Sequence, residues 1–278
     1  MNAYPLNQPY TLPFRIGTTS YIVPDNLLVN ARFLADKVQD MQLVLFDVPG
    51  GPNNLPDAQT VAALAKLADE YTFTYTVHLL SDLSWGNGNH PSLAQARQVI
   101  ELTQALKPWA YVLHLDGKTV RAPDTLPASW QNWQDDSVRA LESVAIWAGD
   151  PALLVVENLE GYPPDFVQPV VQRTPVSRCV DVGHLWLDGI DPVPYLRAAL
   201  PRTRVIHIHG LAARDHESLA HMSPAQLDPV IDVLLKELYT GVLTLEVFGE
   251  QDFNSSRAAL AASIQRCHAA APTQQRSA

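Results

Sequence analysis

The chain has 278 residues, of which 47% are hydrophobic and 17% charged, the composition of an ordinary globular protein. Its formal net charge of −10 argues against a nucleic-acid surface, because phosphate binding needs a concentrated basic face. Two cysteines, Cys179 and Cys267, are too few for a disulfide framework and fit a reducing compartment. The amino terminus lacks the pattern of a signal peptide, and no stretch approaches the roughly 20 apolar residues of a membrane span. We therefore predict a cytoplasmic protein with no membrane segment.

Strand-like and helix-like segments alternate along the chain. The strand-like segments are short β-branched or continuously apolar runs, which indicate strands buried on both faces. In chain order they cover residues 15–20, 41–47, 73–79, 110–116, 152–158, 177–183, 204–210 and 241–248. The intervening segments have apolar residues at helical spacing, with Asp25, Asp57 and Ser223 as expected N-caps. These helices are expected over residues 25–37, 57–70, 92–107, 129–148, 164–172, 192–199, 223–239 and 254–268.

This alternation predicts one α/β domain, a (β/α)8 TIM barrel, over residues 14–270. Residues 1–13 are expected to form an N-terminal extension and residues 271–278 a disordered tail. The competing architecture is a doubly wound open sheet, which usually carries a glycine-rich phosphate loop after its first strand. Residues 17–24, GTTSYIVP, do not supply such a loop, so the barrel is favoured.

Histidines and carboxylates stand at the ends of six successive strand-like segments. In order they are His78, His114, Glu157, Asp181 with His184, His207 with His209, and Glu246. A single residue of this kind is more often a hydrogen-bonded loop residue or a buried ion-pair partner. Six at equivalent positions indicate a shared site, because charged groups seldom enter apolar strands unless they are paired or metal-bound. Barrel active sites lie at this edge, and imidazoles with carboxylates suit Zn²⁺ or Mn²⁺, or else Fe²⁺.

The other histidines and the cysteines receive different predictions. His216, in the loop after residues 204–210, is within reach of the same rim, whereas His221 is expected to cap or face solvent. His90 and His268 are expected to be structural. Cys179 is expected to be a small apolar group inside a strand, without a chemical role.

The pattern at the strand ends resembles the xylose-isomerase-like barrel superfamily, which includes the AP endonuclease called endonuclease IV and the ketose epimerases. The resemblance rests on V-H at 77–78, L-H at 113–114, V-E-N at 156–158, D-V-G-H at 181–184, I-H at 206–207 and L-E-V at 245–247. It implies that the shared metal ion is held by Glu157, Asp181, His207 and Glu246. It also implies that His78 and His114, with Glu157, hold an additional metal as in endonuclease IV, giving one to two ions per chain.

The resemblance gives His184 the position of a histidine that binds a third metal in endonuclease IV and the substrate in the epimerases. In endonuclease IV an Asp-x-His pair follows the seventh strand, and His216 matches its histidine. Arg214 stands where the aspartate would be, and Asp215 is displaced by one residue. A full third metal site of that type is therefore not expected. The acidic net charge adds to the case against DNA repair.

A closer resemblance is to the cobamide-remodelling amidohydrolases of this superfamily. It rests on FRIGTTSYIVP, LVLFD, YTVHLLSDL and HIHG followed by DHESL, four separated parts of the chain. It implies a corrinoid substrate and hydrolysis of the amide between the corrin ring and the nucleotide loop, which releases cobyric acid. The residues expected to bind the substrate are His184, His209, Arg214 and His216. Arg214 would meet the phosphodiester through its guanidinium, and the alternative is a surface ion pair with Asp215 or Glu217.

The residues are compatible with more than one reaction. Glu157, Glu246 and His184 are the expected catalytic residues for hydrolysis with an activated water, a polarised carbonyl and a proton for the leaving amine, and His78 is the alternative source of that proton. In the alternative, a sugar isomerase or epimerase, Glu157 and Glu246 exchange a proton. The pair His78 and His114 favours hydrolysis, because isomerases of this architecture need one metal. A non-catalytic corrinoid-binding protein would not need histidines and carboxylates from six strands.

Overall fold

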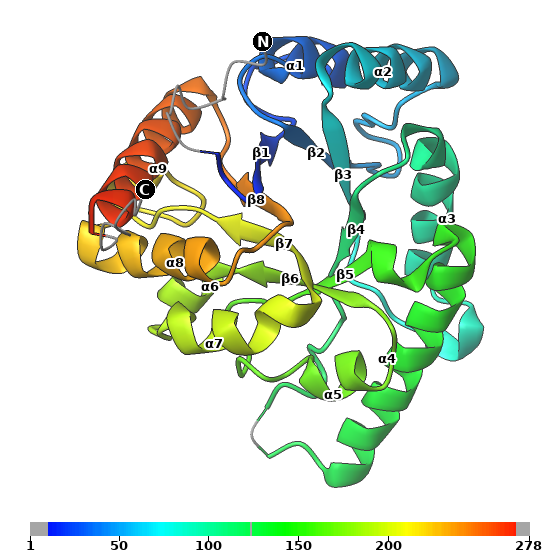
Figure 1. Cartoon of the computed structure of the whole chain (residues 1–278). Helices are drawn as coiled ribbons and strands as arrows, with labels where there is room; N and C mark the ends of the chain where they lie inside the picture. The colour runs from blue at the N-terminus through cyan, green and yellow to red at the C-terminus, as the bar shows by residue number, and fades with distance from the viewer. Residues whose placement is uncertain (1–10, 123, 271–278) are drawn as a thin grey trace, which may run out of the picture.

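Eight parallel strands close into a barrel in the computed structural model, which describes residues 11–122 and 124–270 (Figure 1). The strands are β1 Arg15–Thr19, β2 Asp40–Val44, β3 Thr74–His78, β4 Ala110–Leu113, β5 Leu154–Glu157, β6 Ser177–Asp181, β7 Thr203–Ile208 and β8 Val242–Leu245. Neighbours in sequence pair with each other, and β8 pairs with β1 to close the sheet. The predicted (β/α)8 fold is confirmed. The predicted tail and residues 1–10 of the predicted extension lie outside the described residues.

The helices surround the barrel on its outer face (Figure 1). They are α1 Leu27–Leu34, α2 Ala58–Tyr71, α3 Pro91–Thr103, α4 Pro127–Ala148, α5 Gln168–Gln172, α6 Val182–Leu187, α7 Pro192–Ala199, α8 Pro224–Lys236 and α9 Glu250–Ala270. Short 3-10 turns lie at Gly86–Gly88, Gln104–Leu106, Pro151–Leu153, Leu200–Arg202 and Leu219–His221. Within the described ranges, none of the helices is long and apolar enough to cross a membrane.

The helix starts follow the expected capping chemistry with one correction. Asp57 accepts a hydrogen bond from the Thr60 backbone N–H at 2.7 Å and caps α2, as predicted. The prediction of Asp25 as the first cap is wrong, because Asn26 caps α1 and Asp25 instead accepts from the Asn26 N–H at 2.7 Å. His90 caps α3 through its side chain, which confirms the structural role expected for it.

Apolar residues fill both the barrel and the layer between sheet and helices. A small cluster inside the barrel consists of Ala110, Val112, Val155, Cys179 and Val205, with Trp109 packed against it. Trp109 also lies between two guanidinium groups, with Arg15 3.9 Å and Arg204 4.2 Å from the ring centroid. Trp109 and the two arginines lie at the amino-terminal ends of their strands, opposite the carboxyl ends where active sites of this fold lie.

Candidate metal centre and active site

The strand-end residues singled out from the sequence converge at the carboxyl end of the barrel. His78, Glu157 and Asp181 are the last residues of their strands, so the fold itself brings their side chains to one rim. The rim is a cleft with a volume of about 370 Å³. Its lining includes His78, His114, Glu157, His184, His216 and Glu246, together with Lys118, Arg121 and Tyr162 from loops. Asp181 and His207 are buried, with no exposed surface.

The primary group consists of Glu157, Asp181, His207 and Glu246, whose ligand atoms all lie within 4.8 Å of one another. His207 Nδ1 lies 2.9 Å from Glu157 Oε1 and 3.0 Å from Glu246 Oε2. Asp181 Oδ2 is buried and has no hydrogen-bond partner among the described residues, which is unusual for a carboxylate unless a cation occupies that side. A donor set of three carboxylates and one imidazole fits a divalent ion such as Mn²⁺ or Zn²⁺.

Gln42, on β2, orients two members of the primary group. Its Oε1 lies 2.7 Å from His207 Nε2, and its Nε2 donates to Glu246 Oε1 at 3.2 Å. A proton on His207 Nε2 is thus donated to Gln42, and Nδ1 is left as the nitrogen that faces the carboxylates. This is the usual way in which an outer residue fixes the tautomer of a metal-binding histidine.

Strong electrostatic coupling marks the primary group. Burial raises the pKa of Glu157, but the charge of His207 and hydrogen bonds from imidazoles hold it well below its ordinary value. Glu246 behaves in the same way, again chiefly because of His207. Burial lowers the pKa of His207, yet Cys179 and the two glutamates raise it well above the ordinary value. The carboxylates therefore attract positive charge, for which a proton and a metal ion compete.

A second group consists of His78, His114 and Glu157, again with ligand atoms within 4.8 Å of one another. Glu157 Oε2 lies 3.1 Å from His114 Nε2 and 3.7 Å from His78 Nε2. The other ring nitrogens are held from outside, with His78 Nδ1 2.9 Å from the Leu79 carbonyl and His114 Nδ1 3.2 Å from Asp82 Oδ1. Both imidazoles therefore present Nε2 to the same carboxylate oxygen, as paired metal ligands do.

Cys179 completes a further group with Glu157 and His207 inside the barrel. Its side chain is 1% exposed and packs among apolar residues. Burial raises the pKa of its thiol, so the thiolate that a metal ligand requires is disfavoured. The geometry agrees with the apolar role expected from the sequence.

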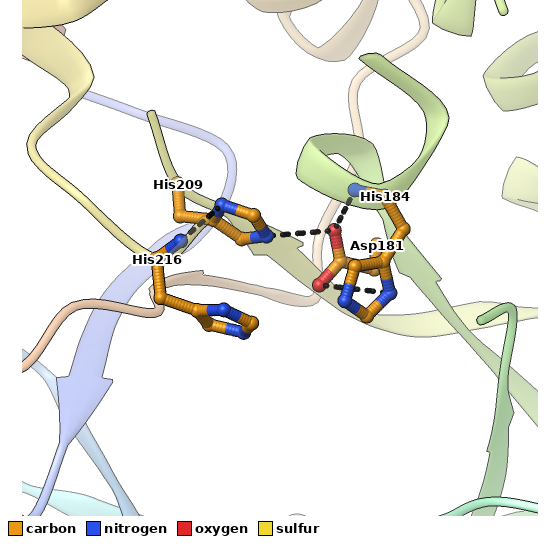
Figure 2. A group of neighbouring side chains, drawn as sticks. All are labelled: Asp181, His184, His209 and His216. Carbon is orange, nitrogen blue, oxygen red and sulfur yellow. Dashed lines mark hydrogen bonds and ion pairs between the residues drawn. The ribbon is translucent and has the colours of Figure 1, made fainter. Parts of the chain in front are cut away.

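The residues expected to bind the substrate divide into two sets. His184, His209 and His216 gather around Asp181, and Figure 2 shows His184 and His209 approaching its carboxylate from opposite sides. Arg214 lies apart from them. Its side chain is 66% exposed, and its Nε lies 3.5 Å from Glu217 Oε1, the surface ion pair considered as the alternative. A substrate contact by Arg214 stays a prediction.

Three supporting residues were not found from the sequence. Gln42 holds His207, and Asp82 holds His114 while accepting from Lys118 at 2.8 Å. Asn158 is joined to the Asp181 backbone by two hydrogen bonds, at 2.9 and 3.0 Å. For Gln42, the available signal was a polar residue inside an otherwise apolar strand. For Asn158, the available signal was its position directly after Glu157.

A closed parallel barrel with a carboxylate and imidazole centre at the carboxyl ends of its strands defines a class of TIM-barrel proteins. Residues 38–269 match the family described as "Xylose isomerase-like TIM barrel", and the chain belongs to this family. A comparison with curated proteins gave no match.

Solved structures share the fold at low sequence identity. A D-tagatose 3-epimerase-like protein is 16% identical, with a TM-score of 0.73, over 92% of this chain and 99% of the other. An L-ribulose 3-epimerase is 14% identical, with a TM-score of 0.68, over 92% and 96%. A probable 3-DHS dehydratase from Bacillus anthracis is 13% identical, with a TM-score of 0.66, over 89% and 97%. At these identities the similarity shows the fold alone.

Proposed function

We propose that this protein is a divalent-metal-dependent enzyme that isomerises or epimerises a small sugar. The observation that carries the proposal is that Glu157 and Glu246 flank one position, 2.9 and 3.0 Å from the same nitrogen of His207. Both glutamates also line the cleft. The names of the structural neighbours above, two epimerases and a dehydratase, support this alternative over amide hydrolysis.

Two carboxylates at one position of the cleft suit a proton transfer to and from a substrate carbon. A divalent ion held by the primary group would act as a Lewis acid on the substrate carbonyl. One glutamate removes the proton from the carbon next to that carbonyl, and the other returns a proton to the opposite face. The carbon is then inverted with no net change in atoms. His184, which lines the cleft, is placed to hydrogen-bond a substrate hydroxyl.

Hydrolysis is the second candidate, and a specific observation favours it. Both oxygens of Glu157 are engaged, Oε1 by His207 and Oε2 by His114. A carboxylate in that position is better suited to bridge two ions than to act as a free base, and two ions sharing a carboxylate suit hydrolysis. With the cobamide that the sequence resemblance implies, water gives up a proton to a cleft carboxylate such as Glu246 and adds to the amide carbonyl carbon. The C–N bond then breaks, and the leaving amine takes a proton from a rim histidine such as His184.

One experiment separates the two candidates. The purified protein, supplied with Mn²⁺ or Zn²⁺, is incubated in D2O with a panel of ketoses and, separately, with cobalamin. Isomerisation or epimerisation places solvent deuterium on a substrate carbon, which mass spectrometry detects, whereas hydrolysis releases a new corrinoid, which chromatography detects. Cobalamin cleavage without turnover of any ketose would replace the proposal by its second candidate.

Two variants connect the reaction to the residues. Glu246→Gln is expected to lose bound metal and activity while remaining folded, and full metal occupancy in this variant would remove Glu246 from the ligand set. The double variant His78→Asn/His114→Asn is expected to keep epimerisation but to abolish any hydrolysis. His221→Asn is a matched control, because His221 is half exposed and pairs only weakly, at 3.6 Å, with Glu217.

A further inference from the structure

Four side chains, one of them shared with the primary group, have no role as a set in the proposed reaction. They are Asp181 at the end of β6, His184 on α6, His209 just after β7, and His216 in the loop that follows. Each offers a ligand atom within 4.8 Å of the others, and Figure 2 shows His184 and His209 at the Asp181 carboxylate with the His216 ring beside that of His209. Arg214 stands at the position of the loop aspartate of endonuclease IV, so the loop supplies no aspartate to this group. His209, directly after β7, is the additional member of the group.

His209 gives the independent sign of a missing ligand. Its side chain is fully buried, and its Nε2 has no hydrogen-bond partner in the part of the chain that the structure describes. The nearest acidic atom is Asp181 Oδ1 at 3.5 Å, which is too far for a good hydrogen bond. Buried polar atoms are rarely left in this state, so a cation between His209 and Asp181 explains the arrangement.

The surroundings of His209 permit the tautomer that a metal ligand needs. Its Nδ1 lies 3.2 Å from the Gly210 carbonyl, and a proton on Nδ1 donated there leaves a lone pair on Nε2. In the arrangement seen here Nδ1 also accepts from the His216 backbone N–H at 3.0 Å. On ion binding, His209 Nδ1 would therefore stop accepting from the His216 N–H and donate to the Gly210 carbonyl instead. The rings of His209 and His216 stack, with centroids 4.1 Å apart.

His184 and His216 are likewise held by their outer nitrogens. His184 Nδ1 lies 3.1 Å from the Asn158 carbonyl, and His216 Nδ1 lies 3.3 Å from Asp215 Oδ2. When these nitrogens carry the protons, each Nε2 keeps its lone pair for a metal ion. His184 Nε2 then lies 3.4 Å from Glu160 Oε2 and His216 Nε2 lies 3.5 Å from Glu246 Oε2, both too far for a good hydrogen bond. The outer partners therefore orient all three imidazoles in the same manner.

Gly183 makes room for the His209 ring. A Cβ atom at this position would lie 2.2 Å from His209 Nε2 and 2.3 Å from its Cε1. Both distances are far below van der Waals contact, so any side chain at position 183 must displace the imidazole. Gly183→Ala is therefore a way to move His209 without removing it.

We propose that Asp181, His184, His209 and His216 bind a zinc ion, in addition to the ion of the primary group. Three imidazoles and one carboxylate, without thiolate, are four ligands of the types that suit Zn²⁺, which is usually bound tetrahedrally. Asp181 joins the two positions, since its Oδ2 also lies 3.9 Å from His207 Nδ1 of the primary group. The site goes beyond the proposed reaction and does not depend on it.

The test is a zinc count that needs no substrate. Native protein and variants are dialysed to equilibrium against buffered Zn²⁺, and bound zinc per chain is measured by elemental analysis. His209→Asn and Gly183→Ala are each expected to bind one equivalent fewer than the native protein, and the control His221→Asn the same number. His216→Asn, on the exposed loop, is expected to repeat the loss if a buried variant fails to fold. Native zinc content in His209→Asn and His216→Asn would overturn the proposal.

A second readout distinguishes this site from the primary group. Co²⁺ in place of zinc gives visible absorption that is intense in tetrahedral sites, and His209→Asn is expected to remove that part of the spectrum. In a Glu246→Gln background, where the primary ion is expected to be lost, the spectrum of the His209 site is expected to remain. If Glu246→Gln removes all cobalt absorption, the second ion is not independently bound and the proposal fails. Neither result depends on which reaction the enzyme catalyses.

Discussion

Asn158 connects the stability of the barrel to the geometry of the metal centre. Its side-chain Nδ2 donates to the Asp181 carbonyl at 2.9 Å, and its Oδ1 accepts from the Asp181 N–H at 3.0 Å. Both bonds are buried and extend the contact between β5 and β6 beyond the last paired residues, Glu157 and Cys179. The Asn158 carbonyl also faces His184 Nδ1. Asn158→Ala removes the two side-chain bonds and leaves the backbone in place.

The expected cost follows from the groups left behind. Two buried backbone groups of Asp181 lose their side-chain partner, and an unsatisfied buried group costs about 1–3 kcal/mol. We expect the free energy of unfolding to fall by about 2–4 kcal/mol, since the backbone relaxes in part. Asp181 also becomes less well oriented, and loss of such an outer partner typically weakens metal binding by about 10–100-fold.

Urea unfolding and zinc titration measure the two effects on the same preparation. Asn132→Ala is the matched control, because Asn132 is exposed on α4 and its substitution is expected to change stability by less than about 0.5 kcal/mol. Asn158→Ala with native stability would show that the two hydrogen bonds contribute nothing. Reduced stability with unchanged zinc affinity would refute the link between Asn158 and the orientation of Asp181.

Three further predictions concern protons, thiols and Gln42. Burial by itself lowers the pKa values of His114 and His216, but nearby carboxylates raise them to about 10 and about 9, respectively. Between the unfolded pKa near 6.5 and these folded values, the folded chain binds more protons than the unfolded chain. In chelator-treated protein the free energy of unfolding should therefore fall by up to about 1.4 kcal/mol per pH unit for each group between pH 7 and 9. Urea unfolding measures this change, and a free energy of unfolding that does not vary with pH would contradict it. Native protein should react with iodoacetamide at Cys267 alone, because Cys179 is buried with a raised thiol pKa, and mass spectrometry would expose a second adduct. Gln42→Ala should weaken zinc binding about 10-fold or more, and an unchanged Kd would show that His207 keeps its orientation unaided.

The fold was predictable because its signals are local and repeated. A strand buried on both faces reads as a short apolar run, and such runs recurred with helical segments between them along the chain. The positions of His78, Glu157 and Asp181 at the ends of such runs then placed them on one rim, and each is the last residue of its strand. The α6 helix, at Val182–Leu187, was missed because it begins directly after β6 without a turn.

The supporting residues were not predictable for a different physical reason. Gln42 lies on β2 and meets His207 on β7, 165 positions away in the chain, through the centre of the barrel. Asp82 meets His114 across 32 positions. Such partners depend on strand register and side-chain direction, which a single sequence does not specify. The packing of His209 against Gly183 was hidden for the same reason, because it is visible only in three dimensions.

The identity of the reaction turns on how Glu157 is used, and that depends on the number of ions. With one ion in the primary group, Glu157 and Glu246 are the two carboxylates that would exchange a proton with the substrate in the proposed epimerisation. With a second ion held by His78 and His114, Glu157 Oε2 is occupied and the carboxylate becomes a bridge, which favours hydrolysis. Because both arrangements use the same four primary residues, sequence patterns at those positions cannot separate them. A metal count on the native protein, compared with the His78→Asn/His114→Asn variant, therefore bears on the reaction before any substrate is known.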